Sequence, residues 1–496
     1  MASVDKPFPP GRYPVVIVGS GPGALQTSYC FRRLGIEHAV ISSDDKPGGM
    51  FQRFPIFQRL ISWSKPYAIA TRGTREYERY DQNSLLADEP EHQALVTGAM
   101  DGTSYFPARA EMERGIAAFV EATGLKVRYG CTWESTRKDG DAFVLTTSDG
   151  EYTCDVPIFA VGMAEPWKPS IPGLEHAPHY VETKEPKHYD DRRVFVIGKR
   201  NSGYELADGL LPHVRQLFIG SPSPTAMSVT TFGVGSARAR YLQPYEDHLL
   251  TGGNFVLDVA IERIEKTSEG FRVHAEGTTH PGTYMIDVDD VIVATGFKVP
   301  MQDLRDLGVA TVMQDRAPAL TPLWESASTP GIYFAGTISQ GAPGLRKYGI
   351  ASSSAAVHGF RCNARILATH IASKHFGIQL PTRDVDPAQV VDLLLDEATL
   401  CPEVWVQKSY LCRVLEKRDG SIVDVGTWPL QHFVDAQGPD GVAIAIETNT
   451  EGVVRPAVYV RRKGDVDEHL LPPEKMHDYR TPEHRRQLES ALGELV

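Results

Sequence analysis

The chain has 496 residues, of which 42% are hydrophobic and 23% charged, with 44 glycines and 35 prolines. This length exceeds one ordinary hydrophobic core, and the composition is that of a loop-rich globular protein, which excludes the disordered and fibrous classes. The formal net charge of −12 argues against a nucleic-acid partner, because phosphate binding needs a concentrated basic footprint.

The N-terminal residues, MASVDKPFPPGRYP, lack the charged and apolar regions of a secretion signal. No later segment offers the roughly 18 continuous apolar residues that a membrane span requires. We therefore expect a cytoplasmic protein with no membrane partner.

The first informative element is a glycine loop between two predicted strands. An apolar run from Val15 to Val18 leads into Gly19, Gly21 and Gly23, a helical pattern follows, and EHAVISSDD reads as the next strand. In such a unit the glycines allow a tight turn and a close approach of a pyrophosphate to the helix N-terminus. An acidic residue about twenty positions further on usually holds the ribose, and Asp44 is the candidate.

The stretch from Lys46 to Ala68 has five aromatic residues, four basic residues and no carboxylate. Its apolar positions Ile56, Phe57, Leu60 and Ile61 predict a helix that begins near Pro55 and has one apolar stripe. Two interpretations stay open: a helix at a membrane surface, or a wall of an internal cofactor and substrate pocket, which the missing negative charge favours.

A second glycine loop repeats the design about 180 residues later. A strand from Val194 to Ile197 enters a loop and a helix, and the candidate nucleotide-binding residues of this loop are Gly198, Lys199, Arg200, Asn201, Ser202 and Gly203. The next strand ends at Ser221 without a carboxylate, which favours a 2′-phosphorylated ribose and hence NADPH over NADH. Arg238 and Arg240 are plausible partners of that phosphate, because a guanidinium binds it bidentately.

Two further segments complete the core of the chain. IDVDDVIVATGFKVP is a strand that ends at Thr295 and Gly296, and TPGIYFAGTISQGAPG is a strand with a glycine-rich turn before a long helix. After about residue 377, short alternating runs predict a small antiparallel sheet, and TPEHRRQLESALGELV predicts a closing helix. This tail is either a packing or dimerisation appendage or a lid over the substrate.

Taken together, the order of these motifs over residues 13–375 resembles the two-dinucleotide-binding-domain flavoprotein superfamily. The resemblance implies an α/β fold with two Rossmann-like domains, plus the small α+β C-terminal appendage. It implies that residues 1–165 and 291–377 form the FAD-binding domain, 166–290 the NADPH-binding domain and 378–496 the appendage. The cofactors would be FAD and NADPH, with no metal. The implied FAD contacts are Gly19, Gly21, Gly23, Asp44, Gly48, Gly49, Met50, Arg53, Thr295, Gly296, Gly336, Thr337 and Gly344.

The cysteines separate the activities known in this superfamily. Its disulfide reductases need a redox-active cysteine pair beside the flavin, yet the six cysteines here form no C-x-x-C pair. GSGPGALQ and DDVIVATGF are similar to segments of N-hydroxylating monooxygenases, whereas PHYVETKEPKHYDDRRVFVIG is closer to bacillithiol-disulfide-reductase-like proteins.

We therefore expect a monooxygenase that acts through a C4a-(hydro)peroxyflavin on a nitrogen or sulfur of a small amine or amino-acid-like substrate, with molecular oxygen as co-substrate. The candidate catalytic residues are Lys65, Asn83, Arg346 and Lys347, as donors and cations for such a substrate. Two alternatives stay open: a reductase that passes electrons to a disulfide, quinone or partner protein, and a non-enzymatic sensor. A homodimer is also open.

Overall fold

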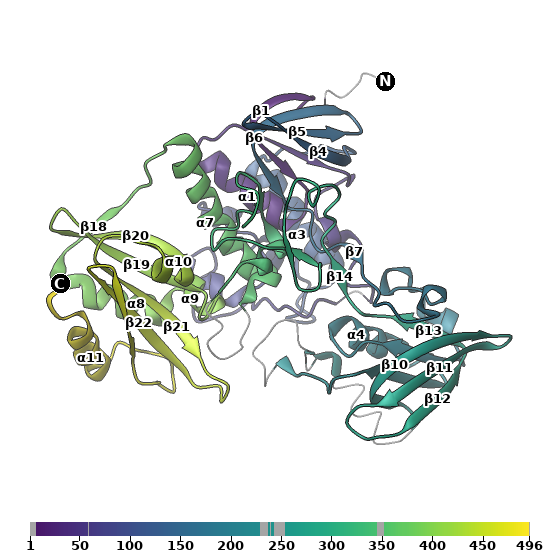
Figure 1. Ribbon diagram of the computed structural model, residues 1–496. Helices are drawn as coiled ribbons and strands as arrows, with labels where there is room; N and C mark the ends of the chain where they lie inside the picture. The colour runs from purple at the N-terminus through teal and green to yellow at the C-terminus, as the bar shows by residue number, and fades with distance from the viewer. Residues whose placement is uncertain are drawn as a thin grey trace. The chain divides into compact units, whose positions relative to one another are not determined.

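The structure is a computed structural model that describes residues 6–57, 59–228, 237–238, 240–242, 253–344 and 352–495. The candidates Arg346 and Lys347 lie outside the described residues. The chain divides into two compact units: residues 53–61 and 164–298 form the second unit, and the remaining residues form the first. Figure 1 shows the elements of each.

The first unit is built on a sheet with strand order β3-β2-β1-β6-β5-β4, to which β17 adds beside β6. Strands β1, β2, β3, β6 and β17 pair in parallel, while β4, β5 and β6 form an antiparallel meander. The strands are β1 (Gly11–Val18), β2 (His38–Ser42), β3 (Arg128–Tyr129), β4 (Trp133–Asp139), β5 (Ala142–Thr147), β6 (Gly150–Phe159) and β17 (Tyr333–Phe334). Because β1 is central and covered on both faces, Val15, Val16 and Ile17 are fully buried.

The helices of the first unit begin at the positions that the motifs indicate. Helix α1 starts directly after the first glycine loop and packs along α7. The helices of this part are α1 (Pro22–Arg33), α2 (Leu95–Ala99), α3 (Arg109–Thr123) and α7 (Val357–Phe376). A short pair, β15 (Thr311–Val312) and β16 (Ala317–Pro318), precedes β17.

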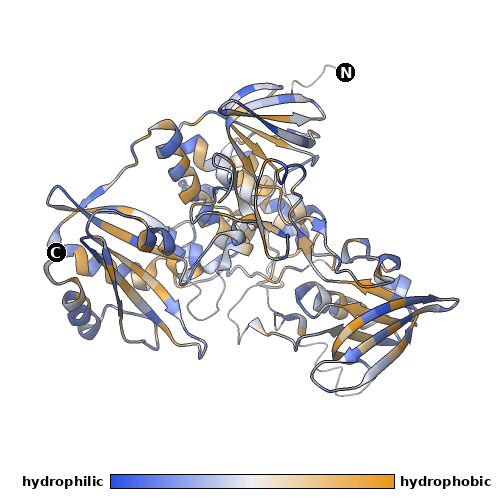
Figure 2. Ribbon diagram, in the orientation of Figure 1, coloured by the Kyte–Doolittle hydropathy of each residue, from blue (hydrophilic) through white to orange (hydrophobic). Residues whose placement is uncertain are grey.

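The C-terminal residues of the first unit form a second, antiparallel sheet of order β18-β20-β19-β21-β22-β23. Its strands are β18 (Arg383–Val385), β19 (Leu411–Arg418), β20 (Ser421–Pro429), β21 (Gly441–Thr448), β22 (Val454–Arg462) and β23 (Asp465–Leu470); its helices are α8 (Val390–Leu400), α9 (Pro402–Val406), α10 (Leu430–Asp435) and α11 (Pro482–Leu492). Figure 2 shows hydrophobic residues along these strands, and both faces of the sheet carry buried clusters. We call residues 378–495 the C-terminal module.

The second unit contains a sheet of order β12-β11-β10-β9-β8-β13, in which β8, β9, β13 and the start of β10 pair in parallel. The strands are β8 (Arg193–Ile197), β9 (Gln216–Ser221), β10 (Phe255–Thr267), β11 (Gly270–Gly277), β12 (Thr283–Val288) and β13 (Asp290–Val293), with helix α4 (Asn201–Leu210) after β8. A two-stranded pair joins β7 (Glu165–Pro166) to β14 (Phe297–Lys298). Each unit thus carries a parallel β-turn-α-β core, which confirms the α/β fold expected from the two glycine loops.

None of the helices among the described residues is both long and apolar enough to cross a lipid bilayer.

Candidate functional site

Backbone atoms of two other segments pack directly against the first glycine loop. At Gly19, φ is +127°, and a Cβ would lie 2.5 Å from the carbonyl oxygen of Ala160 at the end of β6. At Gly23, a Cβ would lie only 2.3 Å from the Cα of Gly336. No side chain fits at either position. Glycine at these positions is therefore what allows the loop to contact the end of β6 and the turn after β17.

Gly48 and Gly49 lie against the same loop. The Gly48 N–H donates to the carbonyl of Ser20 at 3.0 Å, and a Cβ on Gly49 would lie 2.9 Å from the Cα of Gly21. The backbone at Gly21 and Gly49 therefore carries no side chains where α1 begins. The N–H groups in the first turn of a helix have no intrahelical acceptor and favour an anion. This Cβ-free backbone fits the pyrophosphate of FAD.

Asp44 follows the carboxyl end of β2, beside this loop. Its Oδ2 accepts a hydrogen bond from Ser20 Oγ at 2.6 Å, so the loop orients the carboxylate. This is the place where a ribose-binding carboxylate is expected in a Rossmann unit. Met50 lies in the short 3₁₀ turn Gly49–Gln52, and Thr337 in the 3₁₀ turn Gly336–Gly341.

The second unit repeats the close approach at its own loop. At Gly198, φ is +126° and a Cβ would lie 2.4 Å from the carbonyl oxygen of Ala294; at Gly203, a Cβ would lie 2.0 Å from the carbonyl oxygen of Gly198. Arg200 is the N-cap of α4, followed by Asn201 and Ser202 in its first turn. This close approach at the start of α4 fits a second nucleotide, whose phosphates the backbone N–H groups of a helix start favour.

The Lys199 side chain, a candidate nucleotide-binding group, already pairs with a carboxylate of the protein. Its side chain is buried and forms an ion pair with Asp258, which also accepts from Thr279 Oγ1 at 2.7 Å. Asp258 is the cross-strand partner of Ser221, and the Lys199 ammonium holds its carboxyl pKa below the usual value. The sequence pattern did not reveal this pair, because it joins residues 59 positions apart.

The arginines expected at the 2′-phosphate also lie in the second unit. The Arg238 N–H donates to Asn201 Oδ1 at 3.1 Å, which places Arg238 at the start of α4 beside the glycine loop. The Arg240 guanidinium lies 5.1 Å from the ring of Tyr241. Thr295 Oγ1 donates to the carbonyl of Trp167 at 2.6 Å, and the Gly296 carbonyl accepts from the Trp167 N–H at 3.0 Å, so both residues help close the second unit.

The two described catalytic candidates have different environments. A bridge between Ser64 and Asp81 brings their segments together. Lys65 is exposed. Asn83 is fully buried, its Oδ1 accepts from Ser62 Oγ, and its Nδ2 donates to Ser64 Oγ at 3.0 Å. The Asn83 amide is therefore engaged inside the protein.

The helix predicted to begin near Pro55 is wrong, whereas the interpretation of its apolar residues as a wall of the cofactor and substrate pocket stays a prediction. The described residues of this segment, 53–57 and 59–61, form no helix, and the segment 53–61 belongs to the second unit. Phe54, Ile56, Phe57 and Ile61 pack on the buried cluster around β8, β9 and α4. The Phe57 N–H donates to Glu205 Oε1 at 3.0 Å instead of to a carbonyl four residues earlier, so a tertiary acceptor replaces the helical bond. Arg53, an expected FAD contact, begins this segment.

All six cysteines are buried and unpaired. Burial raises the thiol pKa of Cys30 to about 11 and those of Cys154 and Cys362 to about 12. It also raises those of Cys131, Cys401 and Cys412. Thiols in this state are poor nucleophiles, so none is suited to relay electrons as a thiolate. Among the described residues, no cluster of histidine, cysteine and carboxylate side chains could hold a metal ion.

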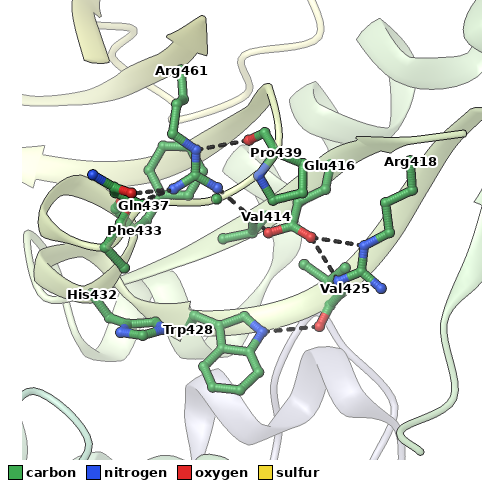
Figure 3. Close-up of a pocket in the computed structure, with 12 residues that line it drawn as sticks. Val414, Glu416, Arg418, Val425, Trp428, His432, Phe433, Gln437, Pro439 and Arg461 are labelled. Carbon is green, nitrogen blue, oxygen red and sulfur yellow. Dashed lines mark hydrogen bonds and ion pairs between the residues drawn. The ribbon is translucent and has the colours of Figure 1, made fainter. Parts of the chain in front are cut away.

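A cavity of about 270 Å³ lies in the C-terminal module (Figure 3). Arg461 is buried beside it and donates to the carbonyls of Phe433, Ala436 and Pro439, while Glu416 binds the guanidinium of Arg418. These charged groups thus pair with the module itself. The cavity contains none of the site residues predicted from the sequence.

Comparison with known proteins agrees with this geometry. A family model described as pyridine nucleotide-disulphide oxidoreductase matches residues 16–336. The mouse FAD-dependent oxidoreductase domain-containing protein 2 is 26% identical over 434 residues, which cover 80% of this chain and 64% of that relative. The rice (Oryza sativa subsp. japonica) indole-3-pyruvate monooxygenase YUCCA1 is 25% identical over 259 residues, 49% of this chain and 58% of the relative. This chain thus spans less than two thirds of either relative.

Among solved structures, the bacillithiol disulfide reductase YpdA of Bacillus cereus is similar with a TM-score of 0.55 and 20% identity, covering 74% of this chain and 100% of that one. This similarity confirms the fold with two Rossmann-like, dinucleotide-binding domains. The family match extends over more than half of the chain and includes both glycine loops. The chain therefore belongs to the pyridine nucleotide-disulphide oxidoreductase family, which implies binding sites for FAD and NADP(H).

Proposed function

We propose that this chain is an FAD- and NADPH-dependent monooxygenase that oxygenates a nitrogen or sulfur of a small amine or amino-acid-like substrate. The observation that carries the proposal is the state of the cysteines: two complete nucleotide loops stand in a chain whose six thiols are all buried and unpaired. This state favours an electron acceptor other than a dithiol of this chain. The rice relative is named as a monooxygenase, which agrees with oxygen as that acceptor.

The residues of this chain would bind and orient rather than exchange protons. The bare backbone at Gly21, Gly23 and Gly49 would hold the FAD pyrophosphate, and Asp44 would accept from the adenosine ribose. FAD held there would supply the redox chemistry that links NADPH oxidation to the use of oxygen. The protein must then exclude water and fix the substrate, a task for which Lys65, Arg346 and Lys347 stay candidates.

The second glycine loop would hold NADPH. Asp258 lies opposite Ser221 at the end of β9, and its negative charge would repel a 2′-phosphate there. The ion pair with Lys199 offsets that charge. Arg200, Arg238 and Arg240 would then supply the positive charge. We expect Arg238→Ala to raise the KM for NADPH about tenfold while leaving that for NADH within about twofold.

The proposed reaction is tested by the fate of the electrons. NADPH oxidation, oxygen uptake and hydrogen peroxide release are measured on the FAD-loaded protein against a panel of amines, amino acids and thioethers. A true substrate should speed NADPH oxidation, lower the peroxide formed per NADPH, and yield a product that carries ¹⁸O from ¹⁸O₂.

The competing reductase predicts a different pattern. NADPH oxidation would then proceed without oxygen when a quinone or low-molecular-weight disulfide is present, and no product would carry ¹⁸O. A complete lack of NADPH oxidation with every acceptor would favour a nucleotide-binding sensor.

A further inference from the structure

Four buried polar side chains join the C-terminal module to the turn after β17. They are Ser339, Ser354, Asn363 and Gln407, and each is at most 2% exposed. Gln407 Nε2 donates to Asn363 Oδ1 at 2.8 Å and to Ser354 Oγ at 3.0 Å. Asn363 Nδ2 in turn donates to Ser339 Oγ and to Ser354 Oγ, both at 3.0 Å. We call this set the Gln407 network.

The Gln407 network ends on the backbone of the expected flavin turn. Ser339 Oγ donates to the carbonyl of Gly336 at 2.7 Å. Gly336 has φ +75° and is the residue whose Cα approaches Gly23 of the first glycine loop. A side chain of the C-terminal module is thus connected, through two intervening side chains, to the point where the turn meets the FAD loop.

Gln407 lies outside the region that the family model matches, which ends at residue 336. It follows α9, in a segment that is tied to the first unit nearby: Trp324 Nε1 donates to Tyr410 Oη at 3.1 Å, and a Cβ on Gly344 would lie 2.7 Å from the ring of Tyr410. The module is therefore docked at residues that flank the flavin turn on both sides.

Gln407 differs from an apolar packing residue in the hydrogen bonds that its amide donates. Its Oε1 is buried and accepts no hydrogen bond from the described residues. An unpaired buried acceptor costs free energy that an apolar side chain of the same size would not, because nothing replaces its bond to water. The amide is better explained by the two bonds that its Nε2 donates toward Asn363 and Ser354.

We propose that Gln407 is a positioning residue for the flavin: through Asn363 and Ser339 it fixes the carbonyl of Gly336, and so sets the conformation of the Gly336–Gly341 turn against the first glycine loop. The C-terminal module is then part of the FAD site rather than a detachable appendage. The inference rests on FAD binding by this family and not on the monooxygenase reaction.

The experiment uses the full-length protein with Gln407→Met, which keeps the side-chain length and removes the amide, and Ser339→Ala, which removes the last hydroxyl of the network. FAD affinity of the apoprotein is measured by quenching of flavin fluorescence. Hydrogen exchange of the peptide over 333–344 is followed in the same apoprotein. Each variant should bind FAD about tenfold more weakly and exchange faster in this peptide.

Ile444→Val is the matched control, since it removes one buried methylene of the module at a fully buried position whose side chain makes no hydrogen bond in the network. It should lower the melting temperature and leave FAD affinity unchanged. The double variant of Gln407 and Ser339 should bind FAD no more than about twofold more weakly than either single variant, because both break one chain of bonds.

Three results would overturn the proposal: FAD affinity within about twofold of wild type in both single variants, additive losses in the double variant, or an equal loss in Ile444→Val. If Gln407→Met does not fold, Ser339→Ala with its exchange measurement decides alone. Since FAD binding is read directly, failure here is distinct from failure of the proposed oxygen chemistry.

Discussion

Single glycines decide how closely other backbone segments approach the first glycine loop. Gly19, Gly23 and Gly49 each face backbone atoms at distances that a Cβ cannot share, so their importance is steric and not only conformational. Gly23 is the clearest case, because the atoms it meets belong to Gly336, more than three hundred positions later in the chain.

Gly23→Ala should therefore disable the FAD site. The new methyl group would lie 2.3 Å from the Cα of Gly336, and backbone cannot move aside as a flexible side chain can. We expect a loss of stability of about 1–3 kcal/mol together with strongly reduced FAD content after purification. Gly98→Ala is the control, since nothing lies within 4 Å of a Cβ there. Normal FAD content in Gly23→Ala would contradict the geometry.

The cysteines give a second prediction at the scale of residues. With a pKa of about 11, Cys30 has about one thiolate in a thousand at pH 8, and the other five thiols are also buried with raised pKa values. We expect the native protein to react slowly with a thiol reagent, and NADPH oxidation to survive the treatment. Rapid modification of one cysteine with loss of activity would instead reveal a redox thiol.

At the scale of elements, the strands and helix starts agree with the local pattern, and the exception is informative. The predicted strands at Val15–Val18 and Val194–Ile197 lie inside β1 and β8, and Thr481 caps α11 as expected. The helix predicted in residues 53–61 did not form, because the partners of this segment are distant in sequence: Phe57 N–H donates to Glu205, and the Phe54 ring packs on Tyr180. Helical spacing of apolar residues could not show that.

Glu205 makes the docking of residues 53–61 sensitive to pH. Its carboxyl accepts from the Phe57 N–H at 3.0 Å and from Tyr180 Oη at 2.6 Å, while burial raises its pKa above the usual 4.5. The folded state holds the Glu205 proton more tightly than the unfolded state does. The stability gained from protonated Glu205 is therefore complete below about pH 4.5 and is lost as pH rises through the raised pKa.

Glu205→Gln removes this ionisation and keeps an acceptor for one of the two donors. The melting temperature of the variant relative to wild type should therefore rise between about pH 5 and about pH 8. The Glu185→Gln substitution, at an exposed position, serves as the control for replacing a carboxylate by an amide. A difference for Glu205→Gln that is independent of pH would show that the carboxyl does not titrate in this range.

At the scale of the whole molecule, the C-terminal module clusters with the FAD-binding part of the chain, and residues 53–61 cluster with the other unit. Ion pairs support the first of these assignments: Arg75 binds Glu397 at 3.0 Å and Glu403 at 3.0 Å, which joins the FAD part to α8 and α9. The Arg79 guanidinium also lies 3.8 Å from the ring of Trp405.

Ligand binding should reveal this division. FAD at about 100 times its dissociation constant should stabilise the first unit by about 2.7 kcal/mol, and slow amides of β21 should share the gain if the module unfolds together with the FAD part. Strand β11, in the second unit, should respond to NADP⁺ and not to FAD. Hydrogen exchange with each ligand separately measures both effects, and a β21 unaffected by FAD would show that the module unfolds on its own.

The sequence alone determined the two nucleotide loops, the strands around them and the antiparallel C-terminal sheet, because each of these signals lies within about thirty neighbouring residues. The tertiary structure decided the pairing of Lys199 with Asp258, the destination of residues 53–61 and the link from Gln407 to Gly336. These contacts join residues far apart in the chain, and a buried amide or carboxylate finds its partner only once the surrounding core excludes water.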